Sequence, residues 1–143
     1  MKIQVHRLHP EAVLPRARHR GDAGADLVAV ESRALSPGER VLIATGLSLA
    51  IPEGYAGFVL PRSGLAFQHG VTLANAPGLI DAGYRGEVKV ALVNLDSAQS
   101  YTVQVGDRIA QLVILAAPAP QFEEVDNLEA SARGEGGFGS SGR

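Results

Sequence analysis

Residues 75–90 read NAPGLIDAGYRGEVKV, and this stretch ends in the pattern of a half-buried β-strand. Val88 and Val90 fall on one face, and Glu87 and Lys89 fall on the other, because successive side chains of a strand point to opposite sides. Burial of the valine face fixes the register of such a strand. We therefore expect a rigid support for the residues that precede it.

The preceding part, residues 75–84, has the composition of a binding segment. Asp81 directly follows Leu79 and Ile80, where a buried carboxylate would be unfavourable without partners. Glycines on both sides of this carboxylate allow tight bends and the close approach of a ligand. These features predict a polar hairpin, braced by the strand, that holds a small molecule.

Composition narrows the class of protein. A chain of 143 residues suits one domain, and 45% hydrophobic with 20% charged residues is typical of a globular protein. The net charge of -2 argues against a broad basic surface, so no nucleic-acid partner is expected. An anionic ligand would therefore need a local cluster of arginines and backbone amides.

Residue types that are missing from the sequence exclude further classes. The chain has no cysteine, which excludes disulfides, zinc–thiolate sites and thiol nucleophiles. The first ten residues, MKIQVHRLHP, lack the apolar core of a secretory signal, and no apolar run reaches the length of a membrane span. We expect a cytoplasmic protein without a membrane partner.

Short β-rich runs follow one another along the chain with little helical periodicity. Strands are expected at residues 3–7, 25–30, 41–44, 47–51, 55–60, 71–73, 87–94, 101–105 and 108–115. Residues 63–68 are the one expected helical turn, with Ser63 as its candidate N-cap. This pattern predicts an all-β sandwich or barrel.

The character of the chain changes after Pro120, so residues 1–120 are expected to form one β domain and residues 121–143 a flexible Gly/Ser-rich arm. Composition alone favours a disordered tail. Arg133 and Phe138, however, flank a glycine run, and a guanidinium with an aromatic ring suits a phosphate and a base. An arm that orders over a bound ligand satisfies both interpretations.

Three further sites are ambiguous when each is taken alone. The tripeptide Arg62-Ser63-Gly64 opens a helical turn and suits an anion, but a capped helix with a surface arginine explains it as well. Asp26 is either a turn or cap residue or lies near the cation of a triphosphate, acting through metal-bound water. Gln111, in an otherwise apolar strand, either faces solvent or contacts a phosphate.

The histidines do not suggest a metal site. His6, His9, His19 and His69 show no metal-ligand spacing with nearby acids, so surface or structural roles are expected for them.

Five segments occur in a fixed order over most of the chain: AGADLVAV, PRSGLA, NAPGLIDAGYRGEV, GDRIAQLV and RGEGGFGSSG. Together they resemble the motifs of the trimeric dUTPases, which hydrolyse dUTP to dUMP and pyrophosphate, and the third and fifth are the most specific. The resemblance implies an all-β jelly roll (β-clip) with one short helix, assembled as a homotrimer with active sites shared between subunits. Leu79 replaces the threonine of many members and is expected to contribute mainly backbone.

The resemblance also implies roles for individual residues. Uracil would be read by Asn75 and by backbone groups of residues 75–84, and Tyr84 would pack on the deoxyribose. Asp81 would deprotonate the water that attacks the α-phosphorus. Mg²⁺ would be held by the triphosphate, with Asp26 acting on it through water. The other expected substrate-binding residues are Arg62, Ser63, Gly64, Leu79, Ile80, Lys89, Gln111, Arg133, Phe138, Gly139 and Ser140.

Other functions fit parts of the same pattern. A dCTP deaminase shares the fold class, but the Gly-rich arm with Phe138 favours a dUTPase. A nucleotide sensor without hydrolysis would not need Asp81. A structural jelly-roll protein would leave Arg62, Asp81 and Tyr84 without a joint purpose.

Overall fold

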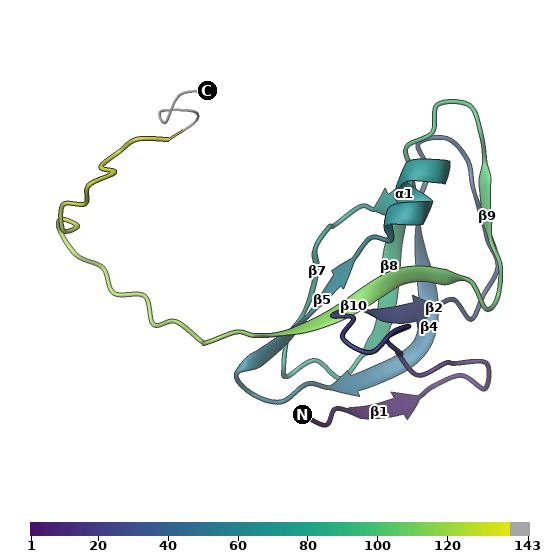
Figure 1. The fold of residues 1–143 in the computed structure, drawn as a ribbon, viewed down its shortest axis with the longest axis horizontal. Coiled ribbons are helices and arrows are strands. Elements are labelled where there is room, and N and C mark those ends of the chain that lie inside the picture. The colour runs from purple at the N-terminus through teal and green to yellow at the C-terminus, as the bar shows by residue number, and fades with distance from the viewer. Residues whose placement is uncertain (138–143) are drawn as a thin grey trace.

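The structure is a computed structural model, and it describes residues 1–137. An all-β jelly roll with one short helix is confirmed (Figure 1). The elements are β1 (Gln4–Arg7), β2 (Ala25–Val28), β3 (Arg33–Leu35), β4 (Arg40–Ala50), β5 (Tyr55–Leu60), α1 (Ser63–His69), β6 (Val71–Leu73), β7 (Gly78–Ile80), β8 (Glu87–Asn94), β9 (Tyr101–Val103) and β10 (Arg108–Ala116).

The strands form two four-stranded sheets and one two-stranded sheet, all antiparallel. The first sheet has the order β1-β4-β8-β6, the second β2-β10-β5-β7, and β3 pairs with β9. Strand β8 buries Val88, Val90 and Leu92 and exposes Lys89, as its alternating sequence predicts. Its apolar face lies in the core between the sheets.

The core consists of large aliphatic side chains from both sheets. Leu27, Ile43, Leu92 and Ile109 are almost completely buried. Each such side chain contributes about 1.5–3 kcal/mol when it leaves water. Asn94 is also fully buried, and its amide group donates to the carbonyl oxygens of Leu35 (3.1 Å) and Gln99 (2.8 Å), which satisfies both N–H bonds.

The 75–84 segment is not a hairpin, contrary to the prediction. It contains β7, which pairs with β5 in the second sheet, whereas the flanking strands β6 and β8 pair with each other in the first sheet. The segment therefore crosses from one sheet to the other and returns. The return turn is closed by a hydrogen bond from the Tyr84 amide to the Asp81 carbonyl oxygen (3.0 Å).

Three other local predictions need correction. The runs 41–44 and 47–51 belong to one long strand, β4, whose pairing with β8 shifts register between Ala44 and Ser48. Strand β3 was not predicted, because its sequence, RAL, has no β-branched or aromatic residue, and it forms by pairing with β9. Ser63 is the first helical residue rather than the N-cap, which is Arg62, and no side chain caps the helix.

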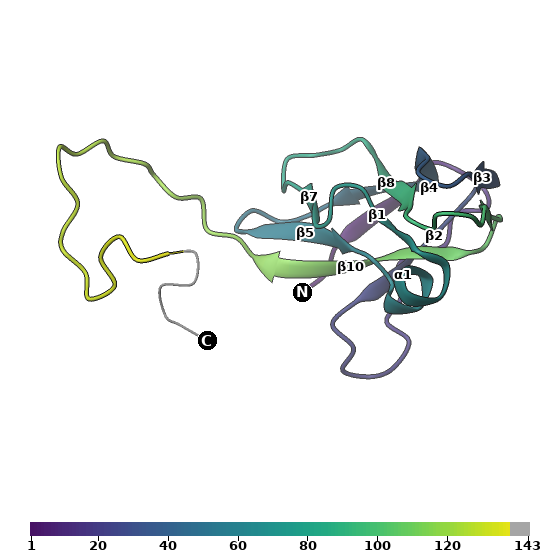
Figure 2. The same cartoon turned by 90° about the horizontal axis from the view of Figure 1, so that it is seen from above.

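The chain after β10 contains no helix or strand as far as residue 137 and leads away from the sheets (Figures 1 and 2). Phe122 and Leu128 in this segment are 95% and 89% exposed. Within residues 1–137, no helix combines the length and apolar character needed to cross a membrane.

Candidate active site

A cleft of about 530 Å³ lies between β7 and β8, and we call it the β7–β8 cleft. Asp81 is exposed at its surface, not buried. Leu79 beside it is 61% exposed, whereas Ile80 points into the core. The lining residues are Leu42, Leu79, Ile80, Asp81, Tyr84, Glu87, Val88 and Lys89.

The position of Tyr84 in this cleft is set by its backbone neighbours. Its hydroxyl group donates to the Glu87 carbonyl oxygen (3.0 Å). The ring lies over Gly86, where an added Cβ atom would be only 2.6 Å from Tyr84 Cζ, so any other residue would displace the ring. Arg85 Nη1 donates to the carbonyl oxygens of Ala82 (2.6 Å) and Tyr84 (2.8 Å), which holds the turn that carries Tyr84.

Lys89 lies on the exposed face of β8, in the same cleft as Asp81. Its Nζ is 3.4 Å from Oε2 of Glu87. The other carboxylate oxygen of Glu87 accepts the backbone N–H of Gly46 (2.9 Å). Glu87 therefore links the lysine to the framework of β4, on the side of the cleft that β8 provides.

A second cleft of about 400 Å³ is lined by β2 and the loop before it, the start of α1 and β10, and we call it the β2–β10 cleft. It contains a charged cluster in which Asp26 Oδ1 lies 3.3 Å from Arg62 Nε and Asp26 Oδ2 lies 3.1 Å from Arg108 Nη1. Arg62 also donates to the Arg108 carbonyl oxygen (2.9 Å). The lining residues are Arg18, Asp22, Ala23, Gly24, Asp26, Arg62, Ser63, Gly64, Arg108 and Gln111.

A bulge in β10 brings Arg108 and Gln111 into this cleft together. Regular alternation would put residues three apart on opposite faces, but the pairing of β10 with β2 shifts register between Arg108 and Ala110. Gln111 is half-buried, and its Nε2 donates to the Pro61 carbonyl oxygen (2.9 Å). Gly24 leaves room for it, since an added Cβ there would overlap Gln111 Oε1.

The structure thus divides most of the predicted site residues between two clefts. Leu79, Ile80, Asp81, Tyr84 and Lys89 share the first, and Asp26, Arg62, Ser63, Gly64 and Gln111 share the second. The two clefts have no lining residue in common.

Other predicted positions lie outside both clefts. Asn75 is exposed at the start of the 75–84 segment, with its amide against Gly78. Arg133 lies in the terminal segment, where its Nε donates to the Gly136 carbonyl oxygen (2.8 Å). The remaining three, Phe138, Gly139 and Ser140, lie outside the described residues.

Sequence reasoning missed several residues that shape these clefts. Arg108 is the clearest case, because it pairs with Asp26 and lies within the GDRIAQLV segment, which also contains Gln111. Arg18 lines the second cleft from the loop before β2. Glu87 and Arg85 act on the first cleft through backbone contacts that no local pattern reveals.

The shifted pKa values of the described residues lie away from both clefts. Backbone hydrogen bonds from Gln99 and Ala98 lower the pKa of Asp96. Burial raises the pKa of Tyr101, assisted by the charge of Asp107 and opposed by that of Arg62. Neither residue lines either cleft.

The acidic residues of the second cleft suit a hydrated metal ion better than a protein cage. No cluster of three or more His, Cys, Asp or Glu side chains able to hold a metal occurs in residues 1–137. Asp22 and Asp26 are the carboxylates in the cleft. Mg²⁺ typically keeps several waters and binds through one or two carboxylates together with substrate phosphates. The donors present fit that mode of binding.

The jelly roll and its two clefts define an all-β protein with one cleft lined by Arg18, Arg62 and Arg108. The family model for dUTPase matches residues 10–142 of this chain. A deoxyuridine 5'-triphosphate nucleotidohydrolase of Thermobifida fusca is 56% identical over 142 residues, covering 99% of this chain and 79% of the relative. The corresponding protein of Wolinella succinogenes is 50% identical over 143 residues, covering 100% and 95%. The chain therefore belongs to the dUTPase family.

Solved structures agree with this assignment. The dUTPase of Staphylococcus bacteriophage 80alpha, with dUPNHPP bound, has a TM-score of 0.92 at 33% identity and covers 99% of each chain. A mutant dUTPase from phage phi11 of S. aureus, in which a structural Mg(II) ion is coordinated, has a TM-score of 0.85 at 29% identity, covering 91% of this chain and 100% of that one.

Proposed function

We propose that this chain catalyses Mg²⁺-dependent hydrolysis of dUTP to dUMP and pyrophosphate, which keeps uracil out of DNA and supplies dUMP for thymidylate synthesis. The observation that carries the proposal is the gathering of the family's motif residues in two clefts, one with Asp81 and Tyr84 and one with Arg62 and Gln111. The phage relative bound to a dUTP analogue supports the choice of substrate.

Residues 75–84 and the β7–β8 cleft bind the nucleoside in this proposal. Asn75 and the backbone read the uracil, and close contact of this segment with C5 of the ring would exclude the methyl group of dTTP. Cytosine presents the wrong donor and acceptor pattern, and mispaired polar groups discriminate strongly. The ring of Tyr84, held over Gly86, packs on the deoxyribose and excludes a ribose hydroxyl group.

Asp81 acts as the general base. Its carboxylate accepts a proton from a water molecule while the water oxygen forms a bond to the α-phosphorus. The bond from the α-phosphorus to the bridging oxygen breaks, and pyrophosphate leaves with that oxygen. Most of the rate acceleration then comes from positioning and from neutralising the charge on the phosphates.

The β2–β10 cleft holds the triphosphate. Arg62 supplies the guanidinium, Ser63 and Gly64 supply hydroxyl and backbone groups, and Gln111 supplies an amide. Asp26 would contact the hydration shell of a Mg²⁺ ion held by the phosphates, and such an ion would neutralise part of their charge. Lys89 adds a positive charge on the nucleoside side of the site.

The separation of the two clefts supports a shared active site. Since they have no lining residue in common, we propose that one dUTP occupies the β7–β8 cleft of one copy and the β2–β10 cleft of another, within a homotrimer. Leu42, Leu79 and Tyr84 at the first cleft are 56%, 61% and 46% exposed, as expected of residues covered by ligand or by a second copy.

The terminal arm completes this site. Residues 1–120 form the catalytic domain and residues 121–143 a flexible arm that closes over the nucleotide of a neighbouring copy. Arg133 then contacts a phosphate, Phe138 stacks on the uracil, and Gly139 and Ser140 supply further contacts to the triphosphate.

The test is pyrophosphate release with Mg²⁺ from dUTP, dTTP, dCTP and UTP in parallel, with light scattering to measure the mass in solution. We expect rapid release from dUTP alone, loss of release with chelator, and the mass of a trimer. Ammonia release from dCTP would establish a deaminase instead. Tight binding of dUTP without product would establish a nucleotide sensor.

A further inference from the structure

The loop before β2 carries a cluster of positive charge beside the β2–β10 cleft. Residues 15–22 read PRARHRGD, with Arg16, Arg18 and Arg20 at alternate positions. Of these three, only Arg18 lines the cleft. None of them belongs to the residues to which the proposed reaction assigns a role.

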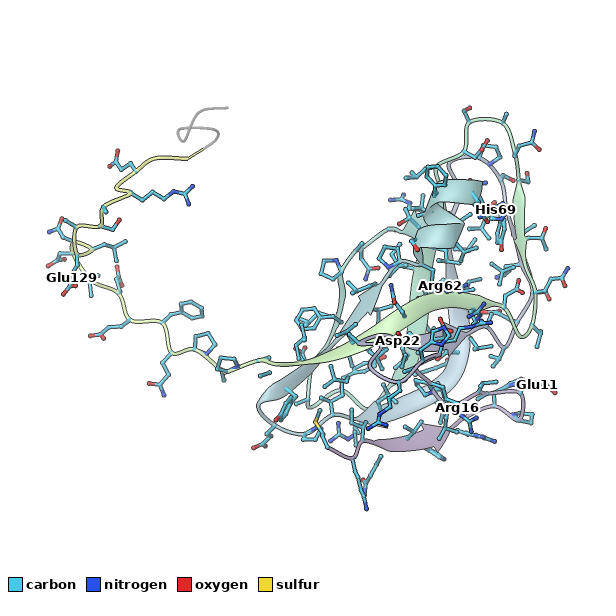
Figure 3. The ribbon with its side chains drawn as sticks, in the orientation of Figure 1. Glu11, Arg16, Asp22, Arg62, His69 and Glu129 are labelled. Carbon is cyan, nitrogen blue, oxygen red and sulfur yellow. The ribbon has the colours of Figure 1, made fainter. Side chains whose placement is uncertain are left out.

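Three hydrogen bonds fix this loop on either side of Arg18. The amide of Asp26 donates to the Arg16 carbonyl oxygen (3.0 Å), which forms an isolated β-bridge. The Asp22 carboxylate accepts the backbone N–H of His19 (2.8 Å), and the Asp22 amide donates to the His19 carbonyl oxygen (3.2 Å). Figure 3 shows Asp22 beside Arg62 at β10, where both line the cleft. The loop is therefore held at the rim of the cleft.

The charges of the cleft leave Arg18 available for an anionic ligand. Asp26 is bound to both Arg62 and Arg108, and Asp22 is occupied by the His19 amide. Among the side chains of residues 1–137, none forms an ion pair with Arg18 within 4.0 Å. An exposed guanidinium at the rim of a cleft that already contains two others favours phosphate, which accepts bidentate hydrogen bonds from arginine.

We infer that Arg18 is a further substrate-binding residue, which contacts the polyphosphate part of dUTP that leaves as pyrophosphate. This inference rests on the proposed function, because that function puts the triphosphate in the β2–β10 cleft. Among the lining residues, Arg62 and Gln111 are half-buried, whereas Arg18 is exposed to solvent. Arg18 therefore covers the phosphates from the solvent side.

Binding of phosphate groups by Arg18 does not depend on catalysis. A cleft with an additional rim guanidinium binds an inorganic polyphosphate that lacks any nucleoside. The probes are therefore inorganic pyrophosphate and tripolyphosphate, whose binding is measured by calorimetry in the presence of Mg²⁺ and as competitive inhibition of dUTP hydrolysis.

Arg18→Gln and Arg20→Gln make a matched pair, because both remove one exposed charge from the same loop and only Arg18 lines the cleft. Loss of one charge-assisted contact at a partly solvated site is expected to raise the Kd for tripolyphosphate about tenfold in Arg18→Gln. The KM for dUTP should rise by a similar factor with kcat nearly unchanged, because the contact exists before and during the reaction. Arg20→Gln should stay within about twofold of the unmodified chain.

A third variant, Arg18→Lys, keeps the charge but loses the planar fork, and it should give an intermediate Kd. Unchanged thermal unfolding of all three variants is expected, since Arg18 and Arg20 are exposed.

Equal effects of Arg18→Gln and Arg20→Gln, or no tripolyphosphate binding by the unmodified chain, would overturn the inference. If the unmodified chain hydrolyses dUTP normally and Arg18→Gln changes neither the Kd for tripolyphosphate nor the KM for dUTP, this inference alone is overturned. Absence of hydrolysis with Arg18-dependent tripolyphosphate binding overturns the proposed function and retains Arg18 only as a polyphosphate contact.

Discussion

The carboxylate of Asp26 lies 3.3 Å from Nε of Arg62, although the two residues belong to different motifs. Arg108 Nη1 approaches the same carboxylate at 3.1 Å. Asp26 therefore separates two guanidinium groups that would otherwise repel each other, and it orients Arg62 in the β2–β10 cleft. The same carboxylate is the one proposed to contact hydrated Mg²⁺.

We expect Asp26→Asn to raise the KM for dUTP about tenfold, because Arg62 loses the partner that aligns it. The partly exposed ion pair should contribute no more than about 1 kcal/mol to the free energy of unfolding. The Mg²⁺ concentration that gives half-maximal activity should also rise. A raised KM with an unchanged Mg²⁺ midpoint would limit Asp26 to orienting the arginine.

Asp81→Asn is expected to bind dUTP and to release pyrophosphate about 10²–10⁴ times more slowly, because an amide cannot accept the proton of the attacking water. The substitution preserves shape, and residue 81 is exposed, so folding should not change. Calorimetry with a non-cleavable analogue measures binding separately from turnover. Release of pyrophosphate at a near-normal rate would remove Asp81 from the role of general base.

A chain that ends before Arg133 is expected to fold, because the core residues all lie before the terminal segment. It should lose most activity if the arm closes the site. Mixing this chain with Asp81→Asn should restore part of the turnover, since an intact arm from one copy can then serve an intact Asp81 on another. Mixed trimers that show no restoration would contradict an arm that crosses between copies.

Gly86→Ala is expected to displace the ring of Tyr84, because the new Cβ would lie 2.6 Å from Tyr84 Cζ. Poorer contact with the deoxyribose should lower kcat/KM for dUTP about 10–100-fold and weaken the discrimination against UTP. Gly83→Ala is the matched control, since a Cβ there meets nothing within 4 Å. Similar losses in both variants would indicate a general sensitivity of the turn rather than a specific effect on Tyr84.

The hydrogen bonds of the Asp96 carboxylate should make the free energy of unfolding depend on pH. Its Oδ1 accepts the amides of Ala98 and Gln99, both at 2.8 Å, and these bonds lower the pKa of Asp96. A lowered pKa in the folded state stabilises the protein above the pKa of the unfolded chain, about 3.9, and this contribution is lost as the pH falls through the folded value. The difference in unfolding temperature between the natural chain and Asp96→Ala should therefore be constant from pH 7 to about pH 5 and should shrink below about pH 4. A difference that persists unchanged in acid would contradict this origin.

Much of the fold was predictable because strand alternation is a local property. The bounds of β5, β6 and β8 agree with those expected from sequence, and the buried face of β8 is the predicted one. The errors occur where pairing depends on distant residues. The 75–84 segment resembles a hairpin in sequence, but β7 finds its partner in β5, in the other sheet.

The candidate site shows the same division between local and distant information. Asp81, Tyr84 and Arg62 were identified from motifs, and each of them lines a cleft. Arg108 was missed, because regular alternation puts it on the opposite face from Gln111 and only a bulge in β10 brings the two together. The bulge depends on the pairing of β10 with β2, so the sequence of β10 alone does not reveal it.

The sequence by itself determined which chemical groups are present and which residues of each strand can face the same side, because both follow from residue identity and a two-residue period. Only the tertiary structure decided which groups share a cleft. Antiparallel pairing joins Asp26 to Gln111, which is 85 positions later in the sequence, and the crossing of the 75–84 segment between sheets puts Asp81 in a cleft separate from Arg62. Those placements depend on which strands pair over long sequence distances. Local periodicity shows which face of a strand is buried but does not identify its partner strand.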